Sequence, residues 1–112
     1  MKLAMHDLRK LHTKADDAEA LLKALANKHR LLILCELHKG ERSVSALMEA
    51  VDLSQSALSQ HLGRLRADKL VETRRDAQTI YYSIAQQAVT ELISTLYNIY
   101  CAPTKPSSST RS

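Results

Sequence analysis

The stretch that decides the fold is residues 43–84, which reads SVSALMEAVDLSQSALSQHLGRLRADKLVETRRDAQTIYYSI. Its first part predicts a helix, a short turn and a second helix, with Ser54 as the N-cap of the second. Leu58, Leu62 and Leu65 recur at helical spacing, so they predict one buried stripe on that helix. Two helices in this order are typical of proteins that place the second helix in the major groove of DNA.

The face opposite this stripe carries short or hydrogen-bonding side chains and Gly63. Such residues let a helix come close enough to base edges for direct readout. The residues that we expect to contact bases are Gln55, Ser56, Ser59 and Gln60. The residues that we expect to position the DNA backbone are His61, Arg64, Arg74, Arg75 and Gln78.

A basic hairpin follows the second helix. Residues 70–73 and 79–84 are rich in β-branched and aromatic residues and predict two strands, joined by the polar residues 74–78. Arginines at the tip of such a wing can meet phosphates or the minor groove. Residues 54–76 hold five cationic against three acidic residues. This surplus is too small to favour DNA binding by itself. The order of the elements is what favours DNA binding over a solvated helix with an exposed hairpin.

Helical spacing predicts three helices outside this stretch. A long first helix would start near Leu8 and end near Asn27, with an apolar seam that resembles a coiled-coil stripe. Residues 28–38 are nearly all apolar and would form a central buried helix ending at Gly40. Residues 85–100 would form the last helix. In the helix at residues 44–51, the residues expected to point inward are Val44, Leu47, Met48 and Val51.

The predicted fold is mainly α with a small β-hairpin. Four helices, two strands and a final helix follow one another, which is the order of a winged helix-turn-helix. We expect one domain at residues 1–101 and a disordered tail at residues 102–112, which are rich in Pro, Ser and Thr. The 112 residues are 45% hydrophobic but include no Phe or Trp, so the core would be thin.

Charge and hydropathy restrict the class of protein. A net charge of +4 favours a polyanionic partner. No apolar run is long enough to span a membrane, and the first residues lack the apolar core of a signal peptide, so we expect a cytoplasmic protein with no membrane partner. In that compartment the two cysteines should rest as thiols.

The first and last helices carry more apolar surface than a monomer of this size readily covers. We expect them to form a homodimer interface, with Leu22, Leu25, Leu92 and Leu96 near the seam. A two-fold dimer would present two recognition helices to successive major grooves, so its double-stranded DNA operator would be an inverted repeat. The alternative, in which these helices only cover their own domain, stays open.

Three phrases, LLKALANKHRLLIL, LSQSALSQHLGRLR and TRRDAQTIYYSI, resemble the ArsR-type winged-helix repressors, and the similarity covers residues 16–101. The resemblance implies a dimeric sensor that regulates transcription. Many members bind metals through a Cys-Val-Cys motif, but this chain has Ser43, Val44 and Ser45 there, and hydroxyls are poor ligands for soft metals. Others bind zinc through the last helix, which here has no His and one carboxylate, Glu91. The sequence therefore predicts no metal and no other cofactor.

Two cysteines remain, Cys35 within ILCELH and Cys101 within YNIYC. Their placement resembles the thiol-based branch of the family, the BigR, SqrR and HlyU type. This resemblance implies that Cys35 and Cys101 sense redox state: a persulfide or polysulfide would couple them within one subunit, and the bridge would lower DNA affinity. A longer sulfur chain can join thiols that are too far apart for an ordinary disulfide.

Other interpretations of the same residues stay open. Cys35 among leucines can be an inert buried thiol, and Cys35, His38 and Cys101 could supply three metal ligands. The regulator could respond to a general oxidant, or the winged helix could bind a protein. No catalytic residue is expected, because the chain has no CxxC pair and the dipole at a helix C-terminus opposes ionisation of Cys101.

Overall fold

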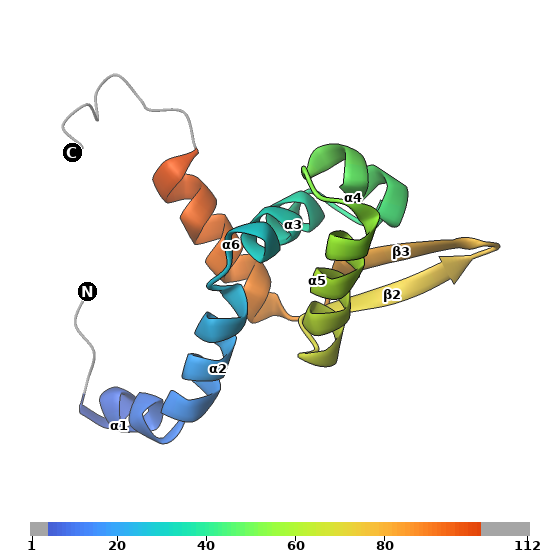
Figure 1. The fold of residues 1–112 in the computed structure, drawn as a ribbon. Coiled ribbons are helices and arrows are strands. Elements are labelled where there is room, and N and C mark those ends of the chain that lie inside the picture. Colours follow the sequence, from blue (N-terminus) through green and yellow to red (C-terminus); the bar gives the residue numbers. More distant parts are fainter. Residues whose placement is uncertain (1–4, 102–112) are drawn as a thin grey trace.

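A computed structural model describes residues 5–101 of the chain (Figure 1). The fold is mainly helical with one small antiparallel sheet, which confirms the predicted class. The elements in chain order are α1 (Met5–Thr13), α2 (Ala15–Leu25), α3 (Lys28–His38), β1 (Arg42–Ser43), α4 (Val44–Ala50), α5 (Gln55–Ala67), β2 (Val71–Asp76), β3 (Thr79–Ile84) and α6 (Gln87–Tyr100). The tail expected at residues 102–112 lies outside the described residues.

Helix α3 is the centre of the fold, because it packs against α2, α4, α5, α6 and β3. Its N-cap is Asn27, whose side-chain oxygen accepts hydrogen bonds from the backbone N–H groups of His29 (3.0 Å) and Arg30 (3.1 Å). At its other end the chain turns at Gly40, whose φ of +141° lies in the region that favours glycine. The helix therefore has a fixed start and a sharp end, as the sequence predicts.

The predicted long first helix is wrong in one respect, since the chain forms two helices that meet at Lys14. Thr13 explains the break. Its hydroxyl donates a 2.8 Å hydrogen bond to the carbonyl of Lys10, and such back-bonding bends a helix. Lys14 then has a φ of −105° and a ψ of 13°, outside the helical range. Helix α1 therefore leaves the axis of α2, and the predicted seam is not continuous.

Three strands form the sheet, in the order β1-β3-β2. β2 and β3 pair from Val71 with Ile84 to Asp76 with Thr79, so the turn is only Ala77 and Gln78. The predicted turn at residues 74–78 is therefore too long, and the two arginines lie on β2 and not at the tip. Polar side chains do not prevent ladder pairing on an exposed ribbon, because the backbone supplies the hydrogen bonds. β1 escaped prediction because two residues show no periodicity.

One apolar core joins all of these elements except α1 and β1. Met48 does not belong to it: it is 36% exposed, so the prediction that it points inward is wrong, and Leu32, on the helix predicted to be buried, is 43% exposed. Each of their helices turns only one face to the core. The last helix starts at Gln87 and not at residue 85, because the N–H of Ala85 donates to the carbonyl of Leu70. The buried core residues are Ala24, Leu25, Ile33, Leu34, Leu37, Leu47, Val51, Leu58, Leu62, Leu65, Leu70, Val71, Val89 and Ile93.

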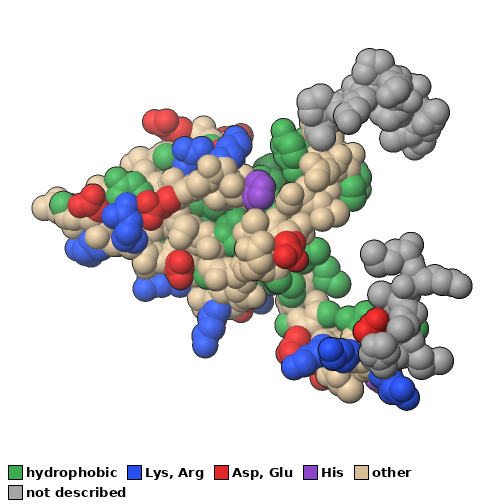
Figure 2. Space-filling view, turned by 180° about the vertical axis from the view of Figure 1, so that it is seen from behind, with side chains coloured by type: hydrophobic (Ala, Val, Ile, Leu, Met, Phe, Trp, Pro, Cys, Tyr) green, Lys and Arg blue, Asp and Glu red, His purple; other side chains and the backbone are tan. Residues whose placement is uncertain are grey.

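The two ends of the molecule differ. In Figure 1, α5 and the wing of β2 and β3 lie on one side of α3, whereas two limbs extend to the other side. One limb is α1 with α2, and the other is the end of α6. Figure 2 shows apolar side chains on both limbs, next to charged side chains on the limb of α1 and α2, and further charged side chains along the wing. Within residues 5–101, no helix is both long and apolar enough to cross a membrane.

Candidate nucleic-acid interface and thiol pair

Helix α5 has the geometry predicted for a recognition helix. The Ser54 hydroxyl accepts a 3.1 Å hydrogen bond from the backbone N–H of Ala57, which confirms the N-cap. The stripe of three leucines on α5 is buried, with at most 2% of each residue exposed. The four residues predicted to contact bases are exposed on the other face, and they are Gln55, Ser56, Ser59 and Gln60.

Hydrogen bonds at the C-terminus of α5 connect it to the wing and to α6. The N–H of Lys69 donates to the carbonyl of Arg66 and the N–H of Leu70 donates to the carbonyl of Leu65, both at 2.9 Å. This is the Schellman pattern of helix ends, here with Lys69 at a φ of 62°. The side-chain amide of Gln86 then donates a 2.8 Å hydrogen bond to the carbonyl of Lys69. The recognition helix, the wing and the start of α6 therefore meet at one junction.

On α5, both residues predicted to contact the DNA backbone have partners within the protein. The Nε of Arg64 lies 3.3 Å from a carboxylate oxygen of Asp68, but the Arg64 side chain stays 64% exposed. His61 is half-buried, and its ring lies 5.6 Å from that of His29 on α3. Desolvation lowers the pKa of His61, and the nearby charges of His29 and Arg30 lower it further. Their contacts to DNA stay predictions.

On the wing, Arg75 and Gln78 are exposed to solvent, whereas the Arg74 side chain contacts other residues of the protein. The guanidinium of Arg74 donates two hydrogen bonds to the carboxylate of Glu41, at 2.9 and 2.8 Å. It also lies over the ring of Tyr81, 4.7 Å from the ring centre. Sequence reasoning missed Glu41, which stands 33 positions from Arg74 and belongs to no motif.

The two cysteines lie on helices that pack against each other, α3 and α6. Cys35 is half-buried against the core, and Cys101 is exposed at the C-cap of α6, where its N–H donates to the carbonyl of Tyr97 at 2.7 Å. Both are free thiols. Burial raises the pKa of Cys35 above its ordinary value of 9.0, and the charges of Cys101 and Glu36 raise it further. Cys101 therefore lies near enough to Cys35 to influence its ionisation.

A metal site at these thiols lacks the required ligands. Among residues 5–101, no three His, Cys, Asp or Glu side chains converge as they would around a metal ion. The alternative set of Cys35, His38 and Cys101 therefore has no geometric support.

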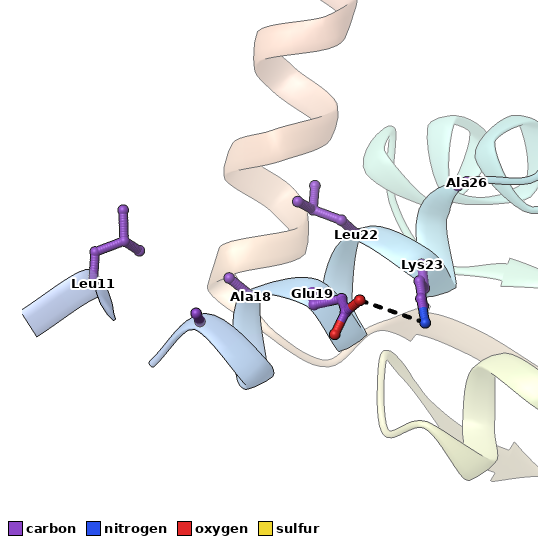
Figure 3. Close-up of a pocket in the computed structure, with 7 residues that line it drawn as sticks. Leu11, Ala18, Glu19, Leu22, Lys23 and Ala26 are labelled. Atoms are coloured by element: carbon purple, nitrogen blue, oxygen red, sulfur yellow. Dashed lines mark ion pairs between the residues drawn. The ribbon is translucent and has the colours of Figure 1, made fainter. Parts of the chain in front are cut away.

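The limb formed by α1 and α2 has an open apolar hollow of about 550 Å³ (Figure 3). Leu11, Ala18 and Leu22 line it, and the ion pair of Glu19 with Lys23, at 3.5 Å, lies at its edge. A second hollow, of about 460 Å³, lies between α2 and α6. Large apolar side chains stay exposed around both limbs, and they are Leu8, Leu11, Leu22, Tyr97, Ile99 and Tyr100.

One residue predicted at the dimer seam does not lie on this surface. Leu25 is only 5% exposed, because it packs into the core of its own chain, so it offers little surface to a partner. Leu22 is 58% exposed, and Leu92 and Leu96 are half-buried.

Comparison with known proteins establishes the family. The family model described as "Bacterial regulatory protein, arsR family" matches residues 27–73. The nodulation protein NolR of Rhizobium meliloti is 56% identical over 89 residues, which are 80% of this chain and 73% of NolR. This chain belongs to the ArsR family. It is a DNA-binding transcriptional regulator and not an enzyme.

Two further ArsR-family relatives agree in sequence and in structure. The transcriptional activator HlyU of Vibrio cholerae is 46% identical over 101 residues, 90% of this chain and 94% of HlyU. A structure of reduced HlyU superposes with a TM-score of 0.79, covering 84% of this chain and 99% of HlyU. The transcriptional repressor BigR from Xylella fastidiosa gives a TM-score of 0.79 at 37% identity, covering 90% of this chain and all of BigR. These likenesses confirm the winged helix-turn-helix fold.

Proposed function

We propose that this regulator is a homodimeric repressor that binds an inverted-repeat operator and releases it when Cys35 and Cys101 react with a persulfide. The observation that carries the proposal is the placement of the thiols. One lies on the helix at the centre of the fold and the other at the end of a limb helix packed against it. A bond between them would change the packing between the DNA-reading end and the limbs.

The proposed DNA contacts come from α5 and the wing. Bases are read by the exposed face of α5, and phosphates are contacted by cationic and amide side chains beside it. The proposed base contacts are Gln55, Ser56, Ser59 and Gln60. The proposed phosphate contacts are His61, Arg64, Arg75 and Gln78.

The dimer interface is proposed on the limbs. The exposed apolar residues of α1, α2 and α6 surround two hollows, and a second copy of the chain would remove them from water. A two-fold axis there places one recognition helix at each end of the dimer, because α5 and the limbs lie on opposite sides of α3 (Figure 1). Both half-sites of an inverted repeat would then be read by the same surface.

The sensing chemistry balances with a low-molecular-weight persulfide, R–S–SH, as oxidant. The thiolate of Cys101, the more exposed thiol, attacks the terminal sulfur, which gives Cys101–S–SH and releases R–SH. The thiolate of Cys35 then attacks the inner sulfur of that group, so a disulfide forms and hydrogen sulfide leaves. If both thiols first accept one sulfur each, the same displacement gives a trisulfide and hydrogen sulfide.

Release of DNA needs only a modest coupling energy. A bridge that fits one arrangement of α3 and α6 better than the DNA-bound arrangement shifts the equilibrium by its difference in free energy. A coupling of about 1 to 3 kcal/mol, typical of allosteric proteins, lowers affinity by about 5- to 150-fold. Packed helices favour discrete arrangements, so a short bridge can select one of them.

The experiment uses a DNA duplex that the reduced protein selects from a random pool. Reduced protein is treated with glutathione persulfide, with glutathione disulfide or with hydrogen peroxide, and intact mass and DNA affinity are measured together. We expect only the persulfide to couple Cys35 to Cys101 by a disulfide or trisulfide and to release DNA, and Cys35→Ser or Cys101→Ser to bind DNA without this response. If Cys101→Ser still releases DNA under persulfide, the two-thiol mechanism is wrong. Release by peroxide with simple disulfide formation would instead identify a general oxidant sensor.

The same duplex tests the DNA surface. Gln60→Ala should relax the preference at one base pair by about 1 to 3 kcal/mol, because it removes a base contact. Arg75→Ala should weaken binding to all sequences alike, because phosphates carry no sequence information. If neither substitution changes affinity at moderate salt, DNA binds elsewhere.

A further inference from the structure

Arg74 joins parts of the chain that are far apart in sequence. It lies on β2, an outer strand of the sheet, and its partner Glu41 comes directly before β1, the other outer strand. β3 lies between them. In the sheet register, Arg74 pairs with Tyr81 of β3, and Tyr81 pairs with Ser43 of β1. The Arg74 side chain therefore crosses the middle strand over the Tyr81 ring and ends on the Glu41 carboxylate.

Glu41 occupies a short link between two helices with different roles. α3, which carries Cys35, ends at His38, and α4, the first helix of the helix-turn-helix, begins after Ser43. The Ser43 hydroxyl caps α4 by accepting a 3.2 Å hydrogen bond from the N–H of Ala46. A contact to Glu41 therefore holds the wing to the segment that starts the DNA-reading unit.

We propose that Glu41 and Arg74 are positioning residues that hold the wing in the orientation that DNA binding needs, and that Arg74 is not a phosphate contact. The inference rests on the proposed function, in which the wing lies on DNA. The forked guanidinium matches the carboxylate with two parallel hydrogen bonds, so both partners are fixed in one geometry. Stacking on the Tyr81 ring removes further freedom from the Arg74 side chain.

Two alternatives are weaker on physical grounds. Single exposed ion pairs contribute little to stability, but this pair is bidentate, stacked on a ring, and set across three strands of a sheet, which is the geometry in which such pairs matter. A phosphate contact by Arg74 would have to displace Glu41 or bring that carboxylate next to the phosphate, and like charges repel. Arg75, the next residue on β2, faces neither cost.

The sign of the effect of Glu41→Gln separates the two roles. If Arg74 contacts phosphate, Glu41→Gln removes a competing negative charge and must strengthen DNA binding. If the pair positions the wing, the same change frees the wing and weakens binding. We expect Glu41→Gln and Arg74→Gln each to weaken binding to the selected duplex by about 3- to 10-fold, since the freed side chains and ribbon must be ordered on binding. The matched control is Glu72→Gln, which removes an exposed carboxylate from β2 and should not weaken binding.

A salt titration and a charge exchange complete the test. Arg74→Gln should keep the wild-type slope of log affinity against log salt, whereas Arg75→Gln should make it shallower by about one unit, the loss of one phosphate contact. The exchange Glu41→Arg with Arg74→Glu should recover most of the wild-type affinity, because the pair can form again in reverse. Thermal unfolding of each variant shows whether the fold is intact.

The outcomes have separate meanings. Unchanged or tighter binding by Glu41→Gln, a shallower salt slope for Arg74→Gln, or further loss in the charge exchange would overturn the positioning role. If wild-type protein selects no duplex, or Arg75→Gln leaves the slope unchanged, the proposed DNA surface is wrong, and the positioning role falls with it.

Discussion

The imidazole rings of His29 and His61 lie 5.6 Å apart, tilted by 40°, and join the first turn of α3 to the middle of the recognition helix. Positive charge on the His61 ring is unfavourable there. The half-buried site and the cationic neighbours lower the pKa of His61 below its ordinary value of 6.5. In the unfolded chain this histidine takes up a proton more readily than in the folded one.

The first prediction concerns stability against pH. Because the folded-state pKa of His61 is lowered, its neutral form favours the folded state above pH 6.5, and this advantage is lost as pH falls below 6.5 through the lowered value. The free energy of unfolding, measured by urea denaturation at several pH values, should fall more steeply over that range in wild type than in His61→Gln. Equal slopes in the two proteins would mean that protonation of His61 does not affect the free energy of unfolding.

The second prediction separates stability from DNA binding at Gly63. An added Cβ there meets no atom of the chain within 4 Å, so Gly63→Ala should raise the free energy of unfolding by about 0.5 to 1 kcal/mol. Gly63 lies on the same exposed face of α5 as Gln60, where the proposed contact with DNA leaves little room. We therefore expect Gly63→Ala to have a higher free energy of unfolding than wild type but to bind the selected duplex more weakly. A more stable variant with unchanged DNA affinity would place that face away from the bases.

The third prediction uses the causes of the raised pKa of Cys35. Alkylation by iodoacetamide should be fast at exposed Cys101 and slow at Cys35, whose rate should still be rising at pH 9.0 because its pKa is raised above that ordinary value. Cys101→Ser removes one source of the shift and should move the pH midpoint of Cys35 alkylation downward. Glu36→Gln should do the same, and Lys39→Gln, which removes a charge that lowers this pKa, should move the midpoint upward. No movement in Cys101→Ser would argue that the two thiols are not neighbours.

The fourth prediction tests the dimer. Leu22 is mostly exposed in the single chain, so Leu22→Glu should leave the fold intact while placing an unpaired charge in the proposed interface, where it costs several kcal/mol. Sedimentation at micromolar concentration should show a dimer for wild type and a monomer for the variant. Ile80→Glu, on the wing strand β3 and away from the limbs, is the matched control and should stay dimeric. A wild-type monomer at that concentration would refute the interface.

Sequence reasoning located the recognition helix because its signals are local. Ser54 directly precedes a 13-residue helix that carries the leucine stripe, so a cap and a period define both the start of this helix and its buried face. The helix break at Lys14 was missed, because it depends on one side-chain hydrogen bond from Thr13 in an otherwise regular pattern. The spacing of apolar residues along the sequence gives no sign of that hydrogen bond.

The ion pair of Arg74 with Glu41 could not be predicted for a different reason. It depends on the register of three strands, and one of them, β1, is only two residues long. From the sequence alone, Arg74 and Arg75 therefore have the same predicted role in the basic hairpin. The register places Arg74 opposite Tyr81 and Arg75 opposite Ile80, so neighbouring arginines receive different surroundings. Pairing across a sheet, and not composition, decides which cation stays free.

The junction at Lys69 limits what a signal from the thiols can change. Gln86 and Ala85, directly before α6, bond to the carbonyls of Lys69 and Leu70, between the recognition helix and the wing. In the proposed function, a shift of α6 would therefore act on the recognition helix and the wing together through this junction. In the proposed dimer, the two recognition helices with their wings would keep their base preference and change only their separation. Such a regulator loses its operator because the half-site spacing no longer fits, so a DNA with altered spacing should retain the oxidised form best.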